Sequence, residues 1–286
     1  MSENHVSRWY KSGDPLLEEI EATRTEAGRA ALWFMGQHGF VVKTGGKTIY
    51  IDVILNDLQD EKGVSMRRYP PPFGPEAPRS PDYYFATHNH SDHLNLDTIL
   101  PLAKKNSQAR FIVPRAHSRI LEDAGIEKER IYGANEGEEL ELPGGISVHP
   151  LAAAHPDYEQ DREGSCLSLG YLIRCGGLGL FHSGDTWATP RLVSSLKALS
   201  PIDIALLPIN GTDWERTAAG IVGNMSALDA VKLARAVEAD LVIPSHYDMM
   251  PGNSENPARF TEFLYELCPQ KRFHICALGE RFIYEK

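Results

Sequence analysis

The sequence predicts an α/β protein with a four-layer α/β/β/α architecture, in which two sheets face each other and helices cover their outer faces. Segments typical of strands alternate with segments typical of helices along the 286 residues. Two segments, Phe40–Asp52 and Tyr171–Asp185, also share a plan: an apolar strand, a Gly-Gly turn, a second apolar strand and a final Asp. Because Gly-Gly suits a tight hairpin, these segments indicate a duplicated β-rich unit.

Short runs rich in β-branched and aromatic residues predict the other strands. They are Tyr83–Ala86, Phe111–Val113, Ile146–His149, Ile204–Leu207, Leu241–Ile243 and Phe273–Ile275. Several of these runs are apolar on both faces, as strands in a covered sheet are. The helices expected between them are Pro15–Thr23, Ala116–Ala124, Pro190–Leu199, Ser226–Glu238 and Pro257–Leu267.

The sequence also predicts how two helices begin and where a long loop lies. Asp14 precedes the first helix and is expected to be its N-cap, and Ser226 with Asp229 predicts a capping box. The segment Asn56–Ser80 is rich in Pro, Gly and charged residues. It therefore predicts a long loop, and loops of this length often act as lids.

Length and composition indicate a single globular domain over residues 1–286, with an N-terminal helical extension over about residues 1–29. Apolar residues make up 42% and charged residues 24%, which is an ordinary globular mixture. No apolar run approaches the roughly 18 residues that span a bilayer. The first residues are polar, so we expect a cytoplasmic protein without a membrane partner.

Charge and cysteine content narrow the choice of partners. With 29 basic and 39 acidic residues the net charge is −10, which disfavours nucleic acid and favours a small-molecule substrate. The four cysteines form no Cys-x-x-Cys pair, so we expect buried or incidental thiols rather than disulfides. They are Cys166, Cys175, Cys268 and Cys276.

The stretch from His88 to His93 follows a predicted strand and places four candidate metal ligands within six residues. In an extended or turning backbone, residues two apart can point to one side, so His88 and His90 can bind one ion as neutral imidazoles. Asp92 and His93 lie on the following turn and can face a second ion. The alternative is a polar surface loop, which the density of ligand residues disfavours.

Three isolated residues at predicted strand ends can complete the site. His155 follows the apolar stretch Val148–Ala154, Asp185 ends the second hairpin, and His246 ends Leu-Val-Ile-Pro-Ser-His. A carboxylate such as Asp185 can bridge two cations, because it offers one oxygen to each. The seven residues together predict a site for two divalent ions, each with a position open for water.

The His-x-His-x-Asp-His box and the later His, Asp and His resemble the motifs of the metallo-β-lactamase superfamily, from Ala31 to about Tyr247. Within it the sequence is most similar to the L-ascorbate-6-phosphate lactonase family. The matching segments are Leu17–Glu21, Ala31–Gly36, Phe181–Thr186 and Val242–Asp248.

This resemblance implies a role for each candidate ligand. It implies that the first ion is held by His88, His90 and His155, and the second by Asp92, His93 and His246. Asp185 would bridge the two ions, and Asp52 would match the supporting Asp of the superfamily. His155 departs from the lactonase family, which has an aspartate there, and restores the general pattern. Histidine-rich ligands favour zinc and the lactonase resemblance favours manganese, so both metals stay open.

The predicted function is that of a metal-dependent hydrolase that opens a small lactone or ester, for example a phosphorylated sugar lactone such as L-ascorbate 6-phosphate. A hydroxide generated by the ions attacks the carbonyl carbon, and Asp92 and His246 are the expected catalytic residues. The resemblance also implies a homo-oligomer. The alternative is a two-metal phosphodiesterase or nuclease, which the acidic charge disfavours. A diiron redox protein is expected to have an acidic residue in place of His90, and the complete ligand set disfavours a non-catalytic binding protein.

Four further residues are candidates for substrate binding. His38 lies in a turn after the first strand, His182 lies just before Asp185, and Tyr247 and Asp248 follow His246. Each has an alternative as a structural residue, and His182 can also orient a metal ligand. We expect an anionic substrate, and the loop arginines that can bind it are Arg67, Arg68, Arg162 and Arg216.

Overall fold

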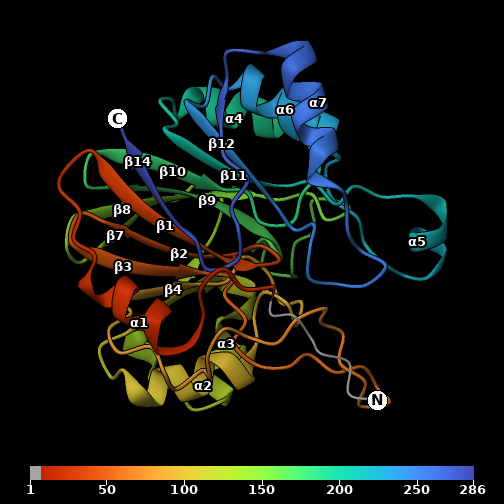
Figure 1. Ribbon diagram of the computed structural model, residues 1–286. Coiled ribbons are helices and arrows are strands. Elements are labelled where there is room, and N and C mark those ends of the chain that lie inside the picture. The colour runs from red at the N-terminus through yellow and green to blue at the C-terminus, as the bar shows by residue number, and fades with distance from the viewer. Residues whose placement is uncertain (1–7) are drawn as a thin grey trace.

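The computed structural model describes residues 8–286, and its strands form two sheets that face each other (Figure 1). The first sheet consists of β1 (Arg29–Gly36), β2 (Gly39–Thr44), β3 (Lys47–Ile51), β4 (Tyr83–Phe85), β5 (Arg110–Pro114), β6 (Ile131–Ala134) and β14 (Arg281–Glu285). Its spatial order is β14-β1-β2-β3-β4-β5-β6. Neighbours from β14 to β3 are antiparallel, and neighbours from β3 to β6 are parallel.

The second sheet repeats this plan. Its strands are β7 (Leu140–Leu142), β8 (Ile146–Ala152), β9 (Leu169–Cys175), β10 (Leu178–His182), β11 (Ile204–Pro208), β12 (Leu241–Ser245) and β13 (Arg272–Phe273). They lie in the order β13-β12-β11-β10-β9-β8-β7. Here too an antiparallel half, β7 to β10, continues into a parallel half, β10 to β13. The repetition agrees with the duplicated unit that the two Gly-Gly hairpins predict.

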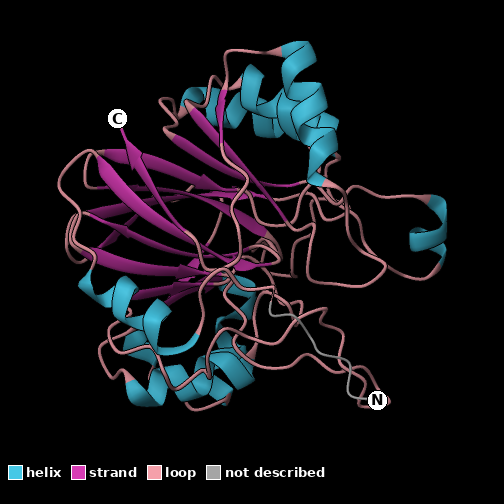
Figure 2. Cartoon of the chain, viewed as in Figure 1, coloured by secondary structure: helices cyan, strands magenta, loops and turns pink. Residues whose placement is uncertain are grey.

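Helices cover the outer faces of both sheets and complete the predicted four layers (Figures 1 and 2). The α-helices are α1 (Gly13–Ala22), α2 (Leu96–Lys105), α3 (Ser118–Asp123), α4 (Pro190–Ala198), α5 (Trp214–Ala218), α6 (Ala227–Ala236) and α7 (Pro257–Leu267). Short 3₁₀ turns lie at Arg115–His117 and Lys128–Arg130. Helices α1 to α3 lie beside the first sheet, and α4, α6 and α7 lie beside the second. Within residues 8–286 no helix has both the length and the hydropathy to cross a bilayer.

Strand β1 shows why its sequence is apolar on both faces. Ala30, Leu32 and Phe34 point to the core between the sheets, whereas Ala31 and Trp33 point to the layer shared with the helices. Successive side chains of a strand alternate between faces, so each face of β1 meets its own apolar layer. A strand with one exposed face alternates apolar and polar residues. Because both faces of β1 are buried, its sequence is a continuous apolar run instead.

The two Gly-Gly hairpins form as predicted, and their turns lie against each other. Gly45 and Gly46 join β2 to β3 and have φ angles of 55° and 73°, which non-glycine residues rarely adopt. Gly176 and Gly177 join β9 to β10 in the same way, with φ angles of 60° and 83°. A Cβ atom on Gly45 would lie 2.8 Å from the sulfur of Cys175, so this turn also needs glycine for close approach between the sheets.

Several predicted helix and strand ends are wrong by a few residues. Asp14 is not the N-cap of α1: Ser12 takes that position, and Asp14 lies in the first helical turn, where a carboxylate favours the helix dipole. The predicted helix Ala116–Ala124 begins with a 3₁₀ turn and becomes α-helical only at Ser118. The predicted strand Phe273–Ile275 pairs only over Arg272–Phe273. The capping box of Ser226 and Asp229 is confirmed.

Helix α2 was not predicted, because Pro101 lies inside it and proline usually ends a helix. The helix forms because the side chain of Asn95 caps it by accepting a hydrogen bond from Thr98 N. Two of its own side chains, Ile99 and Leu102, are buried and stabilise it further. Of the predicted N-terminal extension, about residues 1–29, the structure describes α1 and the segment around it, and the first seven residues lie outside the described part. Strands β6, β7 and β14 and helix α5 had no prediction either.

The predicted loop over 56–80 contains no helix or strand, apart from an isolated bridge between Gln59 and Ser65. Its chain is anchored by Arg67, whose buried guanidinium donates hydrogen bonds to the carbonyl oxygens of Tyr69, Ile54 and Asn56. Arg67 is thus engaged within the loop rather than presented to a ligand. Whether the loop acts as a lid stays a prediction.

Candidate metal centre

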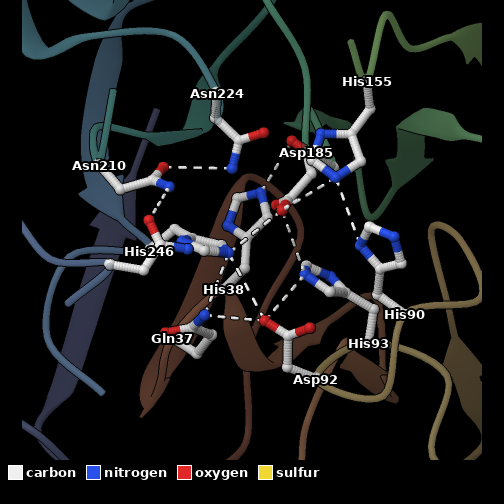
Figure 3. Close-up of polar contacts among 12 residues, drawn as sticks. Gln37, His38, His90, Asp92, His93, His155, Asp185, Asn210, Asn224 and His246 are labelled. Atoms are coloured by element: carbon white, nitrogen blue, oxygen red, sulfur yellow. Dashed lines mark hydrogen bonds and ion pairs between the residues drawn. The ribbon is translucent and has the colours of Figure 1, made fainter. Parts of the chain in front are cut away.

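The seven predicted ligands come from four loops that follow strands at one edge of the sandwich. The loops follow β4 (His88, His90, Asp92 and His93), β8 (His155), β10 (Asp185) and β12 (His246). Figure 3 shows the labelled side chains among them pointing toward one shared space. The pairing of β10, β11 and β12 as parallel neighbours brings the carboxyl ends of β10 and β12 to the same edge.

The ligand atoms form three groups of three, and within each group the atoms lie within 4.8 Å of one another. One group, His88, His93 and Asp185, overlaps the other two, which share no residue and form two separate ligand sets. The first set is His88, His90 and His155, in which His155 Nε2 lies 3.3 Å from His90 Nδ1. The second set is Asp92, His93 and His246. Its carboxylate oxygen Oδ2 of Asp92 lies 3.5 Å from His93 Nε2 and 3.6 Å from His246 Nε2.

Asp185 lies between the two sets. Its Oδ2 atom is 3.1 Å from His246 Nε2, 3.5 Å from His93 Nε2 and 3.9 Å from His155 Nε2. One carboxylate therefore contacts imidazoles of both sets. This is the position that a residue shared by two cations must take.

A divalent cation fits these residues because several of their buried polar atoms have no hydrogen-bond partner. His88 Nε2, His93 Nε2 and Asp185 Oδ1 are such atoms. An unsatisfied buried polar atom costs about 1–3 kcal/mol, and more where charge is involved. A cation relieves that cost, and imidazole with carboxylate is a donor set that zinc and manganese accept.

The electrostatics of the cluster keep its carboxylates ionised. Burial alone would raise the pKa of Asp185, but His246 and His93 outweigh burial and hold it well below the usual range. The reverse holds for His93, since burial alone would lower its pKa but Asp185, Asp92 and Asp52 raise it well above the usual value. Burial dominates at His88 and lowers its pKa well below the usual value. Without an ion, a protonated imidazole therefore balances the carboxylates, and a bound cation would take over that role.

Three residues of the site adopt backbone conformations that favour glycine. Gln37, Asp52 and His246 have φ angles of 57°, 49° and 55°, and Glu238 is the only other non-glycine residue with positive φ in residues 8–286. Such conformations cost roughly 1–3 kcal/mol each and concentrate at functional sites. The backbone at the ends of β1, β3 and β12 is therefore bent to aim these side chains into the centre.

Two histidines predicted to bind substrate lie behind the ligands. His38 and His182 are fully buried, and their ring centroids lie 3.9 Å apart with the ring planes tilted by 34°. His38 contacts Ser245 Oγ at 2.7 Å and the carbonyl oxygen of Gly184 at 3.1 Å. His182 Nε2 lies 2.8 Å from the carbonyl oxygen of His38. These contacts tie the loops that carry Asp185 and His246 together, and a role in substrate binding stays a prediction.

The other two predicted substrate-binding residues lie at the end of β12. Tyr247 is almost fully buried and stacks on Phe34, with ring centroids 6.0 Å apart. Asp248 accepts hydrogen bonds from the backbone nitrogen of Gln37 at 3.0 Å and from the hydroxyl of Tyr69 at 2.6 Å. Both side chains are engaged with the protein, so their contact with substrate also stays a prediction.

Sequence reasoning missed Gln37, which lies in the centre. Its side-chain amide is 2.8 Å from Asp92 Oδ2 and 3.1 Å from His246 Nε2 (Figure 3). Only 1% of Gln37 is exposed. The one local signal is its place beside His38 in a turn flanked by Gly36 and Gly39, since a glutamine alone does not mark a metal site.

A cavity of about 480 Å³ opens onto the two outermost ligands, His90 and Asp92. Its other walls are mainly apolar and come from four loops. They are Ser65, Met66, Ser91, Ile221, Met250, Pro251 and Asn253. Among the described residues that line it, none is lysine or arginine. The cavity has the size and position of a small-molecule site.

The fold and this cluster of histidines and carboxylates define a metal-dependent hydrolase. The sequence model of the family described as "Beta-lactamase superfamily domain" matches residues 47–247. The chain belongs to that family, and the predicted membership of the metallo-β-lactamase superfamily is confirmed.

Comparison with curated proteins and solved structures agrees with this assignment. The chain is 25% identical to the Escherichia coli protein named "Probable L-ascorbate-6-phosphate lactonase UlaG", over 88% of this chain and 79% of that protein. Igni18, a metallo hydrolase from Ignicoccus hospitalis, is 20% identical with a TM-score of 0.68 over 90% of this chain and 99% of its own. An isothiocyanate hydrolase from Delia radicum gut bacteria is 18% identical with a TM-score of 0.70, over 89% and 99%. The two structures share the fold.

Proposed function

We propose that the chain hydrolyses a small lactone or ester with two divalent ions, zinc or manganese. One ion would be held by His88, His90 and His155, and the other by Asp92, His93 and His246, with Asp185 shared between them. The observation that carries this proposal is the convergence of the two ligand sets on Asp185, beside a cavity sized for a small molecule.

The chemistry follows from the positions of the side chains. Divalent ions, when bound, supply Lewis acidity that polarises a carbonyl oxygen and makes a water molecule more acidic. Burial alone would raise the pKa of Asp92, but His93 and His246 hold it well below the usual range, so this carboxylate is ionised. Asp92 also lines the cavity, so it can accept a proton from the attacking water and pass it to the leaving oxygen. His246, beside it, keeps Asp92 in place.

Two observations bear on the substrate. The name of the Escherichia coli relative supports a phosphorylated sugar lactone such as L-ascorbate 6-phosphate. The cavity supports an uncharged lactone or ester with an apolar substituent, because Met66, Ile221 and Met250 line it without a cation among its described walls. Arg216, one of the arginines considered for an anionic substrate, is bound to Asp213 and to the carbonyl oxygen of Asn210. We therefore place the uncharged substrate first.

Three further predictions from the sequence concern the domain organisation, the cellular location and the oligomeric state. We propose one domain over residues 1–286 and a cytoplasmic location, and we propose a homo-oligomer because the resemblance to the lactonases implies one. The phosphodiesterase alternative also uses two ions, but a phosphodiester carries a negative charge that no lysine or arginine among the described cavity walls would help to bind. A phosphodiester is therefore included among the test substrates for comparison.

A substrate panel tests the proposal. Metal-free protein is reconstituted with zinc or manganese and given an alkyl-substituted lactone, a sugar-phosphate lactone, an aryl ester and a phosphodiester. Metal-dependent turnover of lactone or ester, abolished by His90→Ala but not by His149→Ala, supports the function. His149 is a matched control because it lies outside both ligand sets. Turnover of the phosphodiester alone would overturn the proposal, and so would full activity and metal content in His90→Ala.

A further inference from the structure

Gln37 has a backbone conformation that favours glycine, so its side chain needs an explanation. It is held in the left-handed region, with φ 57°, in the turn between β1 and β2. Its backbone nitrogen donates to Asp248, and its carbonyl oxygen accepts from the backbone nitrogen of His246 at 2.5 Å. The turn is thus fixed to the end of β12 on both sides. A glutamine in a strained, anchored turn indicates that its side chain is needed where it points.

The side chain of Gln37 points at two ligands of the second set. Its terminal amide atom lies 2.8 Å from Asp92 Oδ2 and 3.1 Å from His246 Nε2, and these two atoms are 3.6 Å from each other. Atoms that bind one ion at about 2.1 Å are about 3.0 Å apart at right angles and about 3.4 Å apart in a tetrahedron. Relative to Asp92 and His246, Gln37 therefore has the spacing of a further ligand of the same ion.

The polarity of the carboxamide supports the same role. Its oxygen Oε1 is buried and has no hydrogen-bond partner. When an ion is held by His246 Nε2, the single lone pair of that nitrogen is directed at the ion, so an N–H of Gln37 cannot donate to it and would point its positive end at the cation. Oxygen is then favoured at this position, and a half-turn of the terminal bond exchanges nitrogen and oxygen because the group is nearly symmetric in shape.

We propose that the side-chain oxygen of Gln37 is an additional ligand of the second ion, completing the set of Asp92, His93, His246 and Asp185. This inference rests on the proposed two-ion site. It goes beyond that site because the His-x-His-x-Asp-His box and the later ligands do not include Gln37. Its consequence is that the second ion has one fewer position open for water than the ligands predicted from the sequence would leave.

A purely structural role makes a different prediction from a ligand role. In the structural role, the amide nitrogen of Gln37 donates to Asp92 and orients it. Glutamate in place of Gln37 would then set two carboxylates against each other and weaken the site more than an uncharged residue does. In the ligand role, glutamate supplies an anionic oxygen to the cation at the same position. The two roles therefore predict opposite effects of Gln37→Glu.

The test measures metal binding without any substrate. Zinc is titrated calorimetrically into metal-free wild type, Gln37→Met and Gln37→Glu, and the absorption spectrum of the cobalt(II) form reports the coordination number. Gln160→Glu is the control, because it makes the same charge change at an exposed glutamine outside the ligand sets. Thermal unfolding of each metal-free variant checks the fold. Gln37→Glu changes one atom group only and decides between the roles even if Gln37→Met does not fold.

We expect Gln37→Met to lower the affinity for the second ion by at least about tenfold. Loss of a group that only supports a ligand, without binding the ion itself, already lowers metal affinity by roughly 10–100-fold. We expect Gln37→Glu to bind the second ion at least as tightly as wild type, and the cobalt spectrum to change in Gln37→Met only. Weakening by Gln37→Glu, or unchanged binding in a folded Gln37→Met, would overturn the proposal. A protein that binds both ions but turns over none of the test substrates would count against the function alone.

Discussion

His93 Nδ1 lies 2.7 Å from Asp52 Oδ2, and both side chains are fully buried. Asp52 also accepts hydrogen bonds from the backbone nitrogen and the hydroxyl of Thr87. A carboxylate in this position fixes the tautomer of the imidazole and leaves Nε2 of His93 free to face the ligand cluster. Asp52 follows β3, so the first hairpin orients a candidate ligand that it does not itself supply.

The first prediction concerns this pair. Asp52→Asn keeps the shape of the side chain but removes the charge that favours the hydrogen bond from His93. We expect the affinity for metal to fall by about 10–100-fold, which is typical for such supporting carboxylates. The measurement is competition for zinc with a chromophoric chelator. Asp60→Asn, at an exposed position, is the matched control and should bind like wild type; equal affinities in all three proteins would show that Asp52 does not support the centre.

The second prediction concerns pH. In the metal-free protein, burial alone would lower the pKa of His246, but Asp185 and Asp92 outweigh it and raise the pKa from 6.5 to about 9. A group with a raised folded pKa stabilises the fold fully below its unfolded pKa, and this contribution is lost as the pH rises through the folded value. We therefore expect the Tm of the metal-free protein to fall between pH 6.5 and about 9.

Metal affinity should change in the opposite direction over the same range, because an ion must displace the proton from the imidazole. Scanning calorimetry of the metal-free protein and zinc titrations at several pH values measure both trends. His246→Gln, which has no titrating imidazole, should lose the part of the slope that comes from this residue. A Tm that is constant or rises across the window in the wild type contradicts the prediction.

The third prediction concerns the cavity. Met66→Ala removes part of an apolar wall, and burial of a methionine side chain contributes about 1.5–3 kcal/mol. We expect kcat/KM for an alkyl-substituted lactone to fall by roughly tenfold, the equivalent of about 1.4 kcal/mol, with little change for an unsubstituted one. Val64→Ala is the control, since Val64 is 60% exposed and is not among the residues lining the cavity. An equal loss on both lactones would mean that Met66 acts through the fold instead.

The fourth prediction compares two adjacent glycines. A Cβ atom on Gly46 meets nothing within 4 Å, whereas one on Gly45 would lie 2.8 Å from the sulfur of Cys175 and 3.0 Å from the backbone nitrogen of Gly176. Gly46→Ala should cost only the strain of positive φ, roughly 1–2 kcal/mol. Gly45→Ala should cost about 1–3 kcal/mol more, because the two hairpin turns must move apart. Denaturant unfolding measures the difference, and equal costs would show that the turns do not constrain each other.

Local patterns account for the parts of the fold and the site that could be predicted. The Gly-Gly hairpins are visible because two glycines and two apolar runs lie next to each other in the chain. Four of the candidate ligands are visible because they lie within the short segment His88–His93. The capping box of Ser226 and Asp229 spans three residues, and it forms as predicted.

Features that depend on distant segments could not be predicted in this way. Helix α2 contains Pro101, so its local signal was unfavourable, and burial of Ile99 and Leu102 outweighs it. The cavity is lined by Met66, Ile221 and Met250, which come from separate loops and show no common pattern in the sequence.

The sequence by itself determined the sandwich class and the identities of the candidate ligands, because apolar runs, Gly-Gly turns, a dense His and Asp box and single His or Asp residues at predicted strand ends are properties of neighbouring residues. Only the tertiary structure decided that Asp185 lies between the two ligand sets, and that Gln37 reaches His246 across 209 residues of chain. Distances of about 3 Å between side chains result from how sheets, turns and loops pack. That packing is a cooperative property of the whole chain, which no short segment of the sequence encodes.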